Sequence, residues 1–130
     1  MTTDWSVVRF ETLDSTSEEA KRRAALGDDE MPYWIVAEVQ TAGRGRLGRA
    51  WQSPTGNLYT TALMAWPHSL EMALRLPFAA ALAVSDAIEA VCAGATTQLK
   101  WPNDVRVEGQ KLAGILIESG EGPTGRWVSV

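Results

Sequence analysis

Alternating apolar and more polar positions in residues 34–40 are typical of a half-buried strand, because Ile35, Ala37 and Val39 fall on one face. Other short apolar or β-branched runs, bounded by turn residues, predict further strands. These runs are residues 7–10, 58–64, 98–101, 105–107, 112–118 and 127–130. The chain is therefore rich in short strands.

A first helix is predicted after the strand at residues 7–10. Ser15 and Thr16 are each followed three residues later by a glutamate, which is the spacing of a helix-capping box. We therefore expect a helix that begins here and runs to about Leu26, with Gly27 at its C-terminal end.

A second, longer helix is predicted between Pro77, which suits a helix N-terminus, and Gly94, which lies beyond the helix end. Along this helix, one stripe is formed by Phe78, Leu82, Ser85, Ile88 and Cys92. We interpret this helix as a packing element and Cys92 as a small buried hydrophobic residue rather than a nucleophile.

Turns separate the predicted strands at residues 53–57, 102–104 and 108–110, and residues 120–125 are expected to form a loop. This order of elements predicts an α+β fold, with a mostly antiparallel or mixed sheet and helices packed on one face. The chain stops inside the strand predicted at residues 127–130, so we expect an incomplete domain.

Composition narrows the function classes. The 130 residues are 45% hydrophobic, which suits one domain with a real core, and the net charge of −4 argues against a general nucleic-acid surface. One cysteine and one histidine exclude an intramolecular disulfide and a His/Cys metal cluster. With no signal peptide or membrane-length apolar run in the sequence, the cytoplasm is the expected compartment.

Residues 43–51, which read GRGRLGRAW, carry the main candidate chemistry, because three arginines alternate with three glycines after a predicted strand. Glycine exposes backbone N–H groups and each guanidinium offers a planar fork of donors, so the pattern predicts a site for a carboxylate or phosphate. The spacing fits neither the phosphate loop of nucleotide hydrolases nor the dinucleotide-binding fingerprint. A flexible surface loop or an RNA-contacting segment is the alternative interpretation.

Four segments together form a recognisable set of motifs: DSTS at residues 14–17, QTAGRGR at 40–46, KWPND at 100–104 and KLAGIL at 111–116. In this order and spacing they resemble the biotin protein ligases. The resemblance implies the class II synthetase-like biotin/lipoate ligase fold, with residues 1–130 forming the N-terminal part of the catalytic domain. We expect neither a DNA-binding domain nor the small C-terminal β domain of this family within these residues.

The resemblance also implies a two-step reaction. Biotin and Mg²⁺-ATP would form biotinoyl-5′-AMP, from which biotin would pass to a lysine of a biotin carboxyl carrier domain. DNA and membranes are not expected partners, and a homodimer is a possible assembly. Two alternatives stay open, namely a lipoate-type ligase on the same fold and an anion- or RNA-binding module without turnover.

Individual roles follow from the same resemblance. Lys111 and Arg46 would be catalytic, stabilising charge at the carboxylate–phosphate junction. Biotin contacts are implied for Ser15, Thr16, Ser17, Gln40, Gly43, Arg44, Gly45, Arg46, Lys111 and Gly114. Nucleotide contacts are implied for Arg44, Arg46, Arg49, Trp51 and Asn103.

Several of these roles have open alternatives. Ser15 and Thr16 could serve only as helix caps, Arg49 could be a solvated charge, and Trp51 could pack in the core instead of stacking on adenine. Asp104 would orient the acceptor lysine or hold Mg²⁺ through water, and no set of protein metal ligands is expected.

Overall fold

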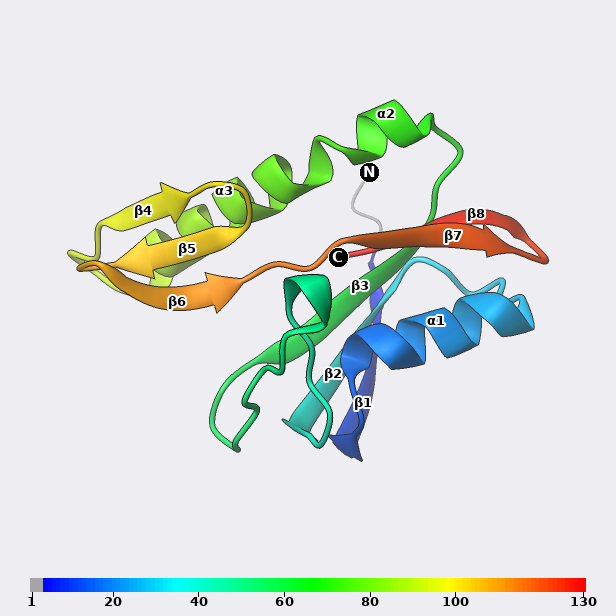
Figure 1. Cartoon of the computed structure of the whole chain (residues 1–130), viewed down its shortest axis with the longest axis horizontal. Helices are drawn as coiled ribbons and strands as arrows, with labels where there is room; N and C mark the ends of the chain where they lie inside the picture. The colour runs from blue at the N-terminus through cyan, green and yellow to red at the C-terminus, as the bar shows by residue number, and fades with distance from the viewer. Residues whose placement is uncertain (1–3) are drawn as a thin grey trace. The chain divides into compact units, whose positions relative to one another are not determined.

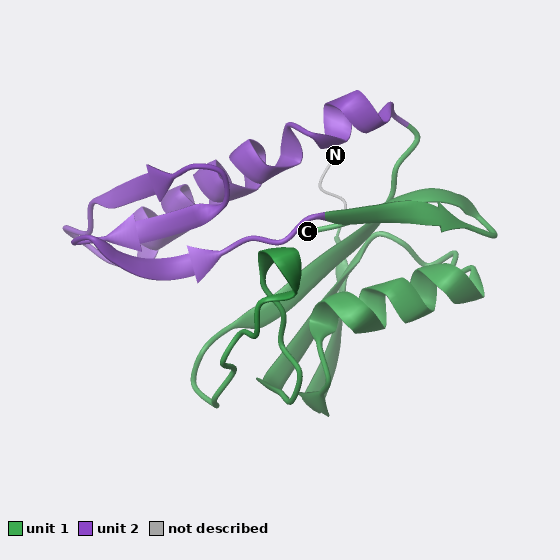
Figure 2. Ribbon diagram, viewed as in Figure 1, with its two compact units in different colours: residues 1–67, 118–130 green, residues 68–117 purple. Residues whose placement is uncertain are grey.

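The computed structural model describes residues 4–130 and divides the chain into two compact units (Figure 2). Unit 1 is formed by the residues up to 67 together with residues 118–130, and unit 2 is formed by residues 68–117. Each unit contains its own β-sheet. The α+β class predicted from the sequence is confirmed, with the strands divided between two sheets.

The sheet of unit 1 has the strand order β1-β2-β3-β8-β7 (Figure 1). Its strands are β1 (Ser6–Leu13), β2 (Tyr33–Gln40), β3 (Tyr59–Ala65), β7 (Glu118–Gly122) and β8 (Gly125–Ser129). Strands β1 and β2 are parallel, and every other neighbouring pair is antiparallel. A parallel pair needs a crossover connection, which helix α1 (Thr16–Leu26) provides.

Helix α1 begins and ends as its sequence predicts. The side chain of Ser15 accepts a hydrogen bond from the backbone N–H of Glu18, and Gly27 adopts a left-handed φ of +79° at the C-terminal end. The helix packs against β2, β3, β7 and β8 on one face of the unit 1 sheet (Figure 1).

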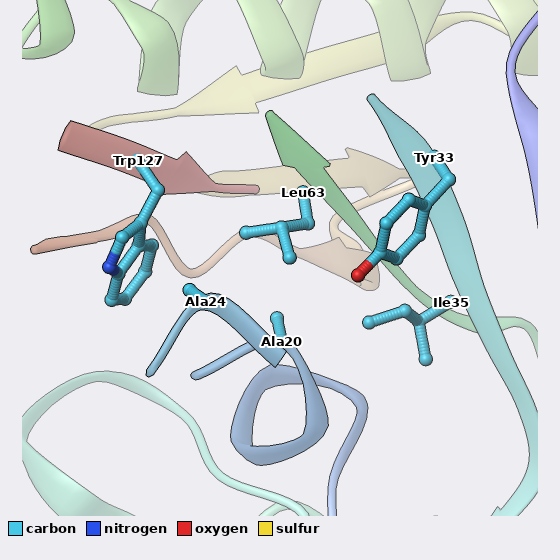
Figure 3. Close-up of a cluster of buried hydrophobic side chains, with 6 residues drawn as sticks. All are labelled: Ala20, Ala24, Tyr33, Ile35, Leu63 and Trp127. Atoms are coloured by element: carbon cyan, nitrogen blue, oxygen red, sulfur yellow. The ribbon is translucent and has the colours of Figure 1, made fainter. Parts of the chain in front are cut away.

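The core of unit 1 lies between α1 and this sheet. The helix contributes only small side chains, Ala20 and Ala24, which allow it to approach the strands closely. The sheet contributes the larger members, which are Tyr33, Ile35, Leu63 and Trp127 (Figure 3). All six side chains are buried, so α1 is held at a fixed place beside the sheet.

The predicted loop at residues 120–125 is wrong, because β7 and β8 pair as a tight hairpin there. A Cβ added to Gly120 would lie 2.7 Å from the ring of Trp127, and one added to Gly122 would lie 2.5 Å from the carbonyl oxygen of Ala24. Both glycines are therefore needed for close packing within a strand, which a sequence reads as loop composition.

Unit 2 contains a three-stranded antiparallel sheet with the order β4-β5-β6. Its elements are α2 (Leu70–Ala73), α3 (Leu76–Val91), β4 (Thr97–Lys100), β5 (Asp104–Val107) and β6 (Gln110–Gly114). Helix α3 packs against β4 and β5, with Ala81 and Ser85 as its buried positions. The predicted turns that join these strands are confirmed.

Two further predictions are corrected in this part of the chain. The single strand expected at residues 112–118 is divided, because β6 ends at Gly114 and β7 begins at Glu118. Cys92 is exposed rather than buried, because it follows the last residue of α3 and caps the helix end. Among the described residues, no helix is long and apolar enough to cross a membrane.

Candidate active site

The parallel pairing of β1 and β2 builds the first part of the site. Leu13 pairs with Gln40, so both strands end at the same edge of the sheet, where α1 also begins. The carbonyl oxygen of the Gln40 side chain accepts hydrogen bonds from the backbone N–H and the hydroxyl of Thr16, at 2.8 and 3.2 Å. Ser15 and Thr16 are both buried, so the predicted polar residues do meet at this edge.

These residues belong to a continuous chain of hydrogen bonds, which we call the polar chain. Thr61 donates to the Thr16 hydroxyl at 2.8 Å, and Thr16 donates to the carbonyl oxygen of Gln40. The amide nitrogen of Gln40 donates to Ser53 at 3.1 Å, and Ser53 donates to the backbone carbonyl of Trp51 at 3.1 Å. Every donor in the polar chain points the same way, which fixes the orientation of the Gln40 amide.

Two members of the polar chain, Ser53 and Thr61, are not predicted from the sequence. Ser53 has the composition of an ordinary turn residue, and only its burial reveals its part in the polar chain. Thr61 lies on the buried face of β3, where an unpaired hydroxyl would be costly, and its partner Thr16 is distant in the sequence.

Asp14 fixes the segment just before the helix. Its side chain accepts a hydrogen bond from the N–H of Ser15 at 2.7 Å, and its backbone carbonyl accepts one from Ala42 at 2.8 Å. Hydrogen bonds from the Arg22 guanidinium, the strongest influence on it, lower the pKa of the Asp14 carboxyl to about 2. Asp14 therefore joins the start of α1 to the loop that follows β2.

That loop, residues 41–51, has a closed base. Trp51 donates its N–H to the carbonyl of Gly43 at 2.9 Å, and Gly45 donates to Arg49 at 2.7 Å. A short 3₁₀ turn, Arg46–Gly48, forms the tip, with Leu47 at a left-handed φ of +58°. The structure thus gives this arginine-rich segment a defined backbone, which we call the arginine loop.

Gly43 is packed against the polar chain. A Cβ at this position would lie 2.5 Å from the Ser53 hydroxyl, 2.7 Å from the Trp51 carbonyl and 2.9 Å from the Gln40 amide nitrogen. The residue has to be glycine for the loop to approach the end of β2 so closely.

The three arginines of the loop have different surroundings. Arg44 makes ion pairs with Glu18 at 2.6 Å and with Glu118 at 3.1 Å. Arg46 and Arg49 are exposed, and neither forms an ion pair within residues 4–130. The loop therefore presents two guanidinium groups to solvent.

In unit 2, a second group of predicted residues meets on β5 and β6. Asp104 pairs with Gly114, and a bulge in the register between these strands places Lys111 opposite Arg106. The Lys111 ammonium lies 2.9 Å from the Asp104 carboxylate, and the Asn103 side chain donates to the carbonyl of Ile115 at 2.9 Å. These contacts bring the KWPND turn and the KLAG strand together.

The same turn borders an open, mainly apolar pocket of about 260 Å³ within unit 2. The pocket is lined by Phe78, Ala81, Leu82, Leu99, Lys100, Trp101, Pro102 and Asp104. The first half of α3 contributes Phe78, Ala81 and Leu82 to this lining, and Phe78 and Leu82 are exposed rather than packed in a core.

The predicted site residues thus form two clusters. The cluster in unit 1 holds Ser15, Thr16, Ser17, Gln40, Gly43, Arg44, Gly45, Arg46, Arg49 and Trp51. The cluster in unit 2 holds Asn103, Asp104, Lys111 and Gly114. Ser17 lies in the first turn of α1, and Trp51 is half-buried at the base of the arginine loop.

Comparison with known proteins places this arrangement in a family. The profile of the Biotin/lipoate A/B protein ligase family matches residues 9–130. Biotin–[acetyl-CoA-carboxylase] ligase of Paracoccus denitrificans is 43% identical over 119 residues, which are 90% of this chain and 49% of that protein.

Solved structures agree with the sequence match. Biotin protein ligase from Aquifex aeolicus, in complex with biotin and ATP, has a TM-score of 0.74 and 31% identity over 95% of this chain and 50% of its own. The Leishmania major enzyme, in complex with biotinyl-5-AMP, has a TM-score of 0.76 and 31% identity over 95% of this chain and 55% of its own. The present chain spans about half the length of these relatives. It belongs to the biotin/lipoate A/B protein ligase family.

Proposed function

We propose that this chain activates biotin with ATP to form biotinoyl-5′-AMP, as the first step in attaching biotin to a carrier lysine. The observation that carries this proposal is the buried polar chain, which adjoins a loop with two exposed arginines. One part suits a neutral polar head group and the other suits an anion. Biotin has both features. The solved structures similar to this chain hold biotin and ATP in one case and biotinyl-5-AMP in the other.

The head group would lie against the start of α1. The ureido ring of biotin has one carbonyl acceptor and two N–H donors, which hydroxyl and amide groups can pair. Ser15, Thr16 and Gln40 supply such groups in a fixed arrangement, and Ser17 lies in the same helical turn. Gly43 and Gly45 would let the ligand approach the backbone of the loop.

The reaction brings two anions together. The biotin carboxylate attacks the α-phosphorus of ATP, the bond to the bridging oxygen breaks, and pyrophosphate leaves with the electron pair. Fixed cations are needed to offset the repulsion and the charge that develops. We assign this role to Arg46 and Lys111, with Arg49, Trp51 and Asn103 as further nucleotide contacts.

Magnesium is best treated as part of the ATP substrate. Within the described residues, no group of three or more His, Cys, Asp or Glu side chains is placed to hold a metal ion. Asp104 is already paired with Lys111 at 2.9 Å. We assign Asp104 to orienting Lys111 or the acceptor lysine, or to holding the Mg²⁺ of the ATP substrate through water.

In the second step, the amine of a carrier lysine attacks the mixed anhydride and AMP leaves. The partner is a biotin carboxyl carrier domain, and the cytoplasm is the compartment where we expect the reaction. A homodimer stays a prediction.

The proposal is tested by pyrophosphate release from the chain supplied with biotin and Mg²⁺-ATP. We expect release that depends on biotin and that lipoate does not replace. Turnover of lipoate in preference to biotin would favour the lipoate-type ligase. Binding of biotin or ATP without pyrophosphate release would instead identify a binding module.

The polar chain has its own test in Thr16→Val. The change removes a hydroxyl that accepts from Thr61 and donates to Gln40, so we expect biotin affinity to fall about tenfold. Thr60→Val is the matched control, because the Thr60 hydroxyl donates to the carbonyl of Ile35 on the neighbouring strand and not to a member of the polar chain. Equal biotin affinities in the two variants would remove the polar chain from ligand binding.

A further inference from the structure

Four charged side chains of unit 1 form a cluster, which we call the charge cluster. Arg44 lies 2.6 Å from Glu18 and 3.1 Å from Glu118. Lys21 lies 2.9 Å from Glu118 and 3.4 Å from Glu18. Two cations thus share two carboxylates, and the charges balance within the protein.

The charge cluster joins three segments that are distant in the sequence. Arg44 comes from the arginine loop, Glu18 and Lys21 from the first turns of α1, and Glu118 from the start of β7. The backbone N–H of Glu18 also donates to the Ser15 side chain. The arginine loop is therefore tied, through one guanidinium, to the helix end that bears the polar residues.

Burial strengthens this connection. The side chain of Glu118 is 19% exposed and that of Arg44 is 30% exposed, so solvent screens their attraction less than at an open surface. The Arg44 Nε atom is buried and makes no hydrogen bond to any residue in the described range. An N–H group buried in this way is suited to donate to a bound oxygen.

Arg44 differs in this respect from the other two arginines. Its Nη2 atom is taken by protein carboxylates, whereas Arg46 and Arg49 are exposed without an ion pair to a described residue. The sequence alone could not divide the roles of Arg44 and Arg46. The ion pairs divide these roles. Two glutamates already neutralise the Arg44 guanidinium, so it is held in place before any ligand binds.

We propose that Glu118 and Glu18 are positioning residues for Arg44. They hold its guanidinium by one edge, which fixes the base of the arginine loop and leaves Arg46 and Arg49 to meet the anion. The functional part of this inference rests on the proposed biotin activation. The anchoring part does not, because it concerns the chain without ligand.

Amide hydrogen exchange of the unliganded chain tests the anchoring. We expect Glu118→Gln to speed exchange of the Gly45 and Trp51 amides about fivefold, the factor for a partly exposed ion pair of about 1 kcal/mol. The matched control is Glu121→Gln, which makes the same change on the same strand at an ion pair with Arg126. Equal exchange at these amides in both variants would overturn the anchoring.

The rate at which the chain releases biotinoyl-AMP tests whether the position of Arg44 affects ligand binding. We expect release to be about fivefold faster in Glu118→Gln than in Glu121→Gln, with Glu118→Asp in between because it keeps the carboxylate. A merely structural role would instead lower the melting temperature of Glu118→Gln and leave release unchanged, which would overturn the positioning. If the wild-type chain forms no adenylate, the proposed function fails, and the exchange comparison alone decides the anchoring.

Discussion

At the scale of single residues, Gly43 controls how closely the arginine loop approaches the polar chain. We predict that Gly43→Ala destabilises the chain by about 1–3 kcal/mol, because its Cβ would meet the hydroxyl of Ser53 at 2.5 Å and two other polar atoms within 3 Å. Under the proposed function, displacement of Ser53 and Gln40 would also weaken biotin binding. Urea unfolding and biotin titration measure the two effects.

Gly45→Ala is the control for this change. The nearest atom to a Cβ at Gly45 is 3.6 Å away, and its φ of −104° is one that alanine adopts. We expect its stability to stay within about 0.5 kcal/mol of the wild type. A similar loss of stability in both variants would show that the loop, and not contact with the polar chain, requires glycine.

Asp14 gives a prediction about pH. Its folded-state pKa of about 2 lies below the ordinary value of 3.8, so its stabilising effect is complete above the ordinary value and is lost as the pH falls towards 2. Because the side chain is 42% exposed, we expect a contribution of at most about 1 kcal/mol. Unfolding free energies of wild type and Asp14→Asn should therefore converge between about pH 4 and about pH 2.

Arg22→Gln should lose the same pH-dependent contribution, since Arg22 is the main cause of the lowered pKa. The double variant should lose no more of this pH-dependent contribution than either single one, because both changes remove the interaction between Arg22 and Asp14. Additive losses in the double variant would mean that the Asp14 side chain stabilises the chain through the N–H of Ser15 and not through Arg22.

At the scale of elements, the hairpin of β7 and β8 depends on small residues facing α1. We predict that Gly122→Ala costs about 1–3 kcal/mol, because its Cβ would lie 2.5 Å from the Ala24 carbonyl, a backbone atom that cannot turn aside. Ser119→Ala, at an exposed position of the same strand, should change stability by less than about 0.5 kcal/mol. Thermal unfolding of the two variants decides this.

The elements that the sequence predicted correctly are those whose signals are local. Capping at Ser15 and Gly27 and alternation at Ile35 and Ala37 depend on neighbours in the chain, and the structure confirms both. The β7 strand was missed because Gly120 and Gly122 look like loop residues unless the positions of Trp127 and Ala24 are known. Contacts between distant segments decide such cases.

The same distinction holds for the candidate site. Motif resemblance identified Ser15, Thr16 and Gln40, and the structure brings them together. It did not identify Ser53, Thr61 or Glu118, whose importance comes from partners far away in sequence. The pairing of Lys111 with Asp104 also depends on the register between two strands.

At the scale of the whole molecule, the two units differ in how much apolar surface they bury. In unit 2 the buried apolar residues among those described are Ala73, Ala81 and Val105. The large apolar side chains exposed in the same unit are Leu70, Met72, Leu74, Phe78, Leu82, Val91, Leu99, Trp101 and Leu112. Burial of apolar surface is the main favourable contribution to folding, so unit 2 has the weaker core.

We therefore predict that unit 2 opens before unit 1. Native-state hydrogen exchange should give lower opening free energies for the amides of β4, β5 and β6 than for those of β1, β2 and β3.

Val105 and Val128 offer a matched pair of variants, because each is fully buried and they lie in different units. Replacing either by alanine should cost about 1–3 kcal/mol, since two methyl groups are lost from a packed site. We expect Val105→Ala to speed exchange only in unit 2, and Val128→Ala to lower the global stability that protects β1, β2 and β3. Uniform exchange across both units, or equal effects of the two variants on all strands, would show that the chain unfolds as one cooperative body.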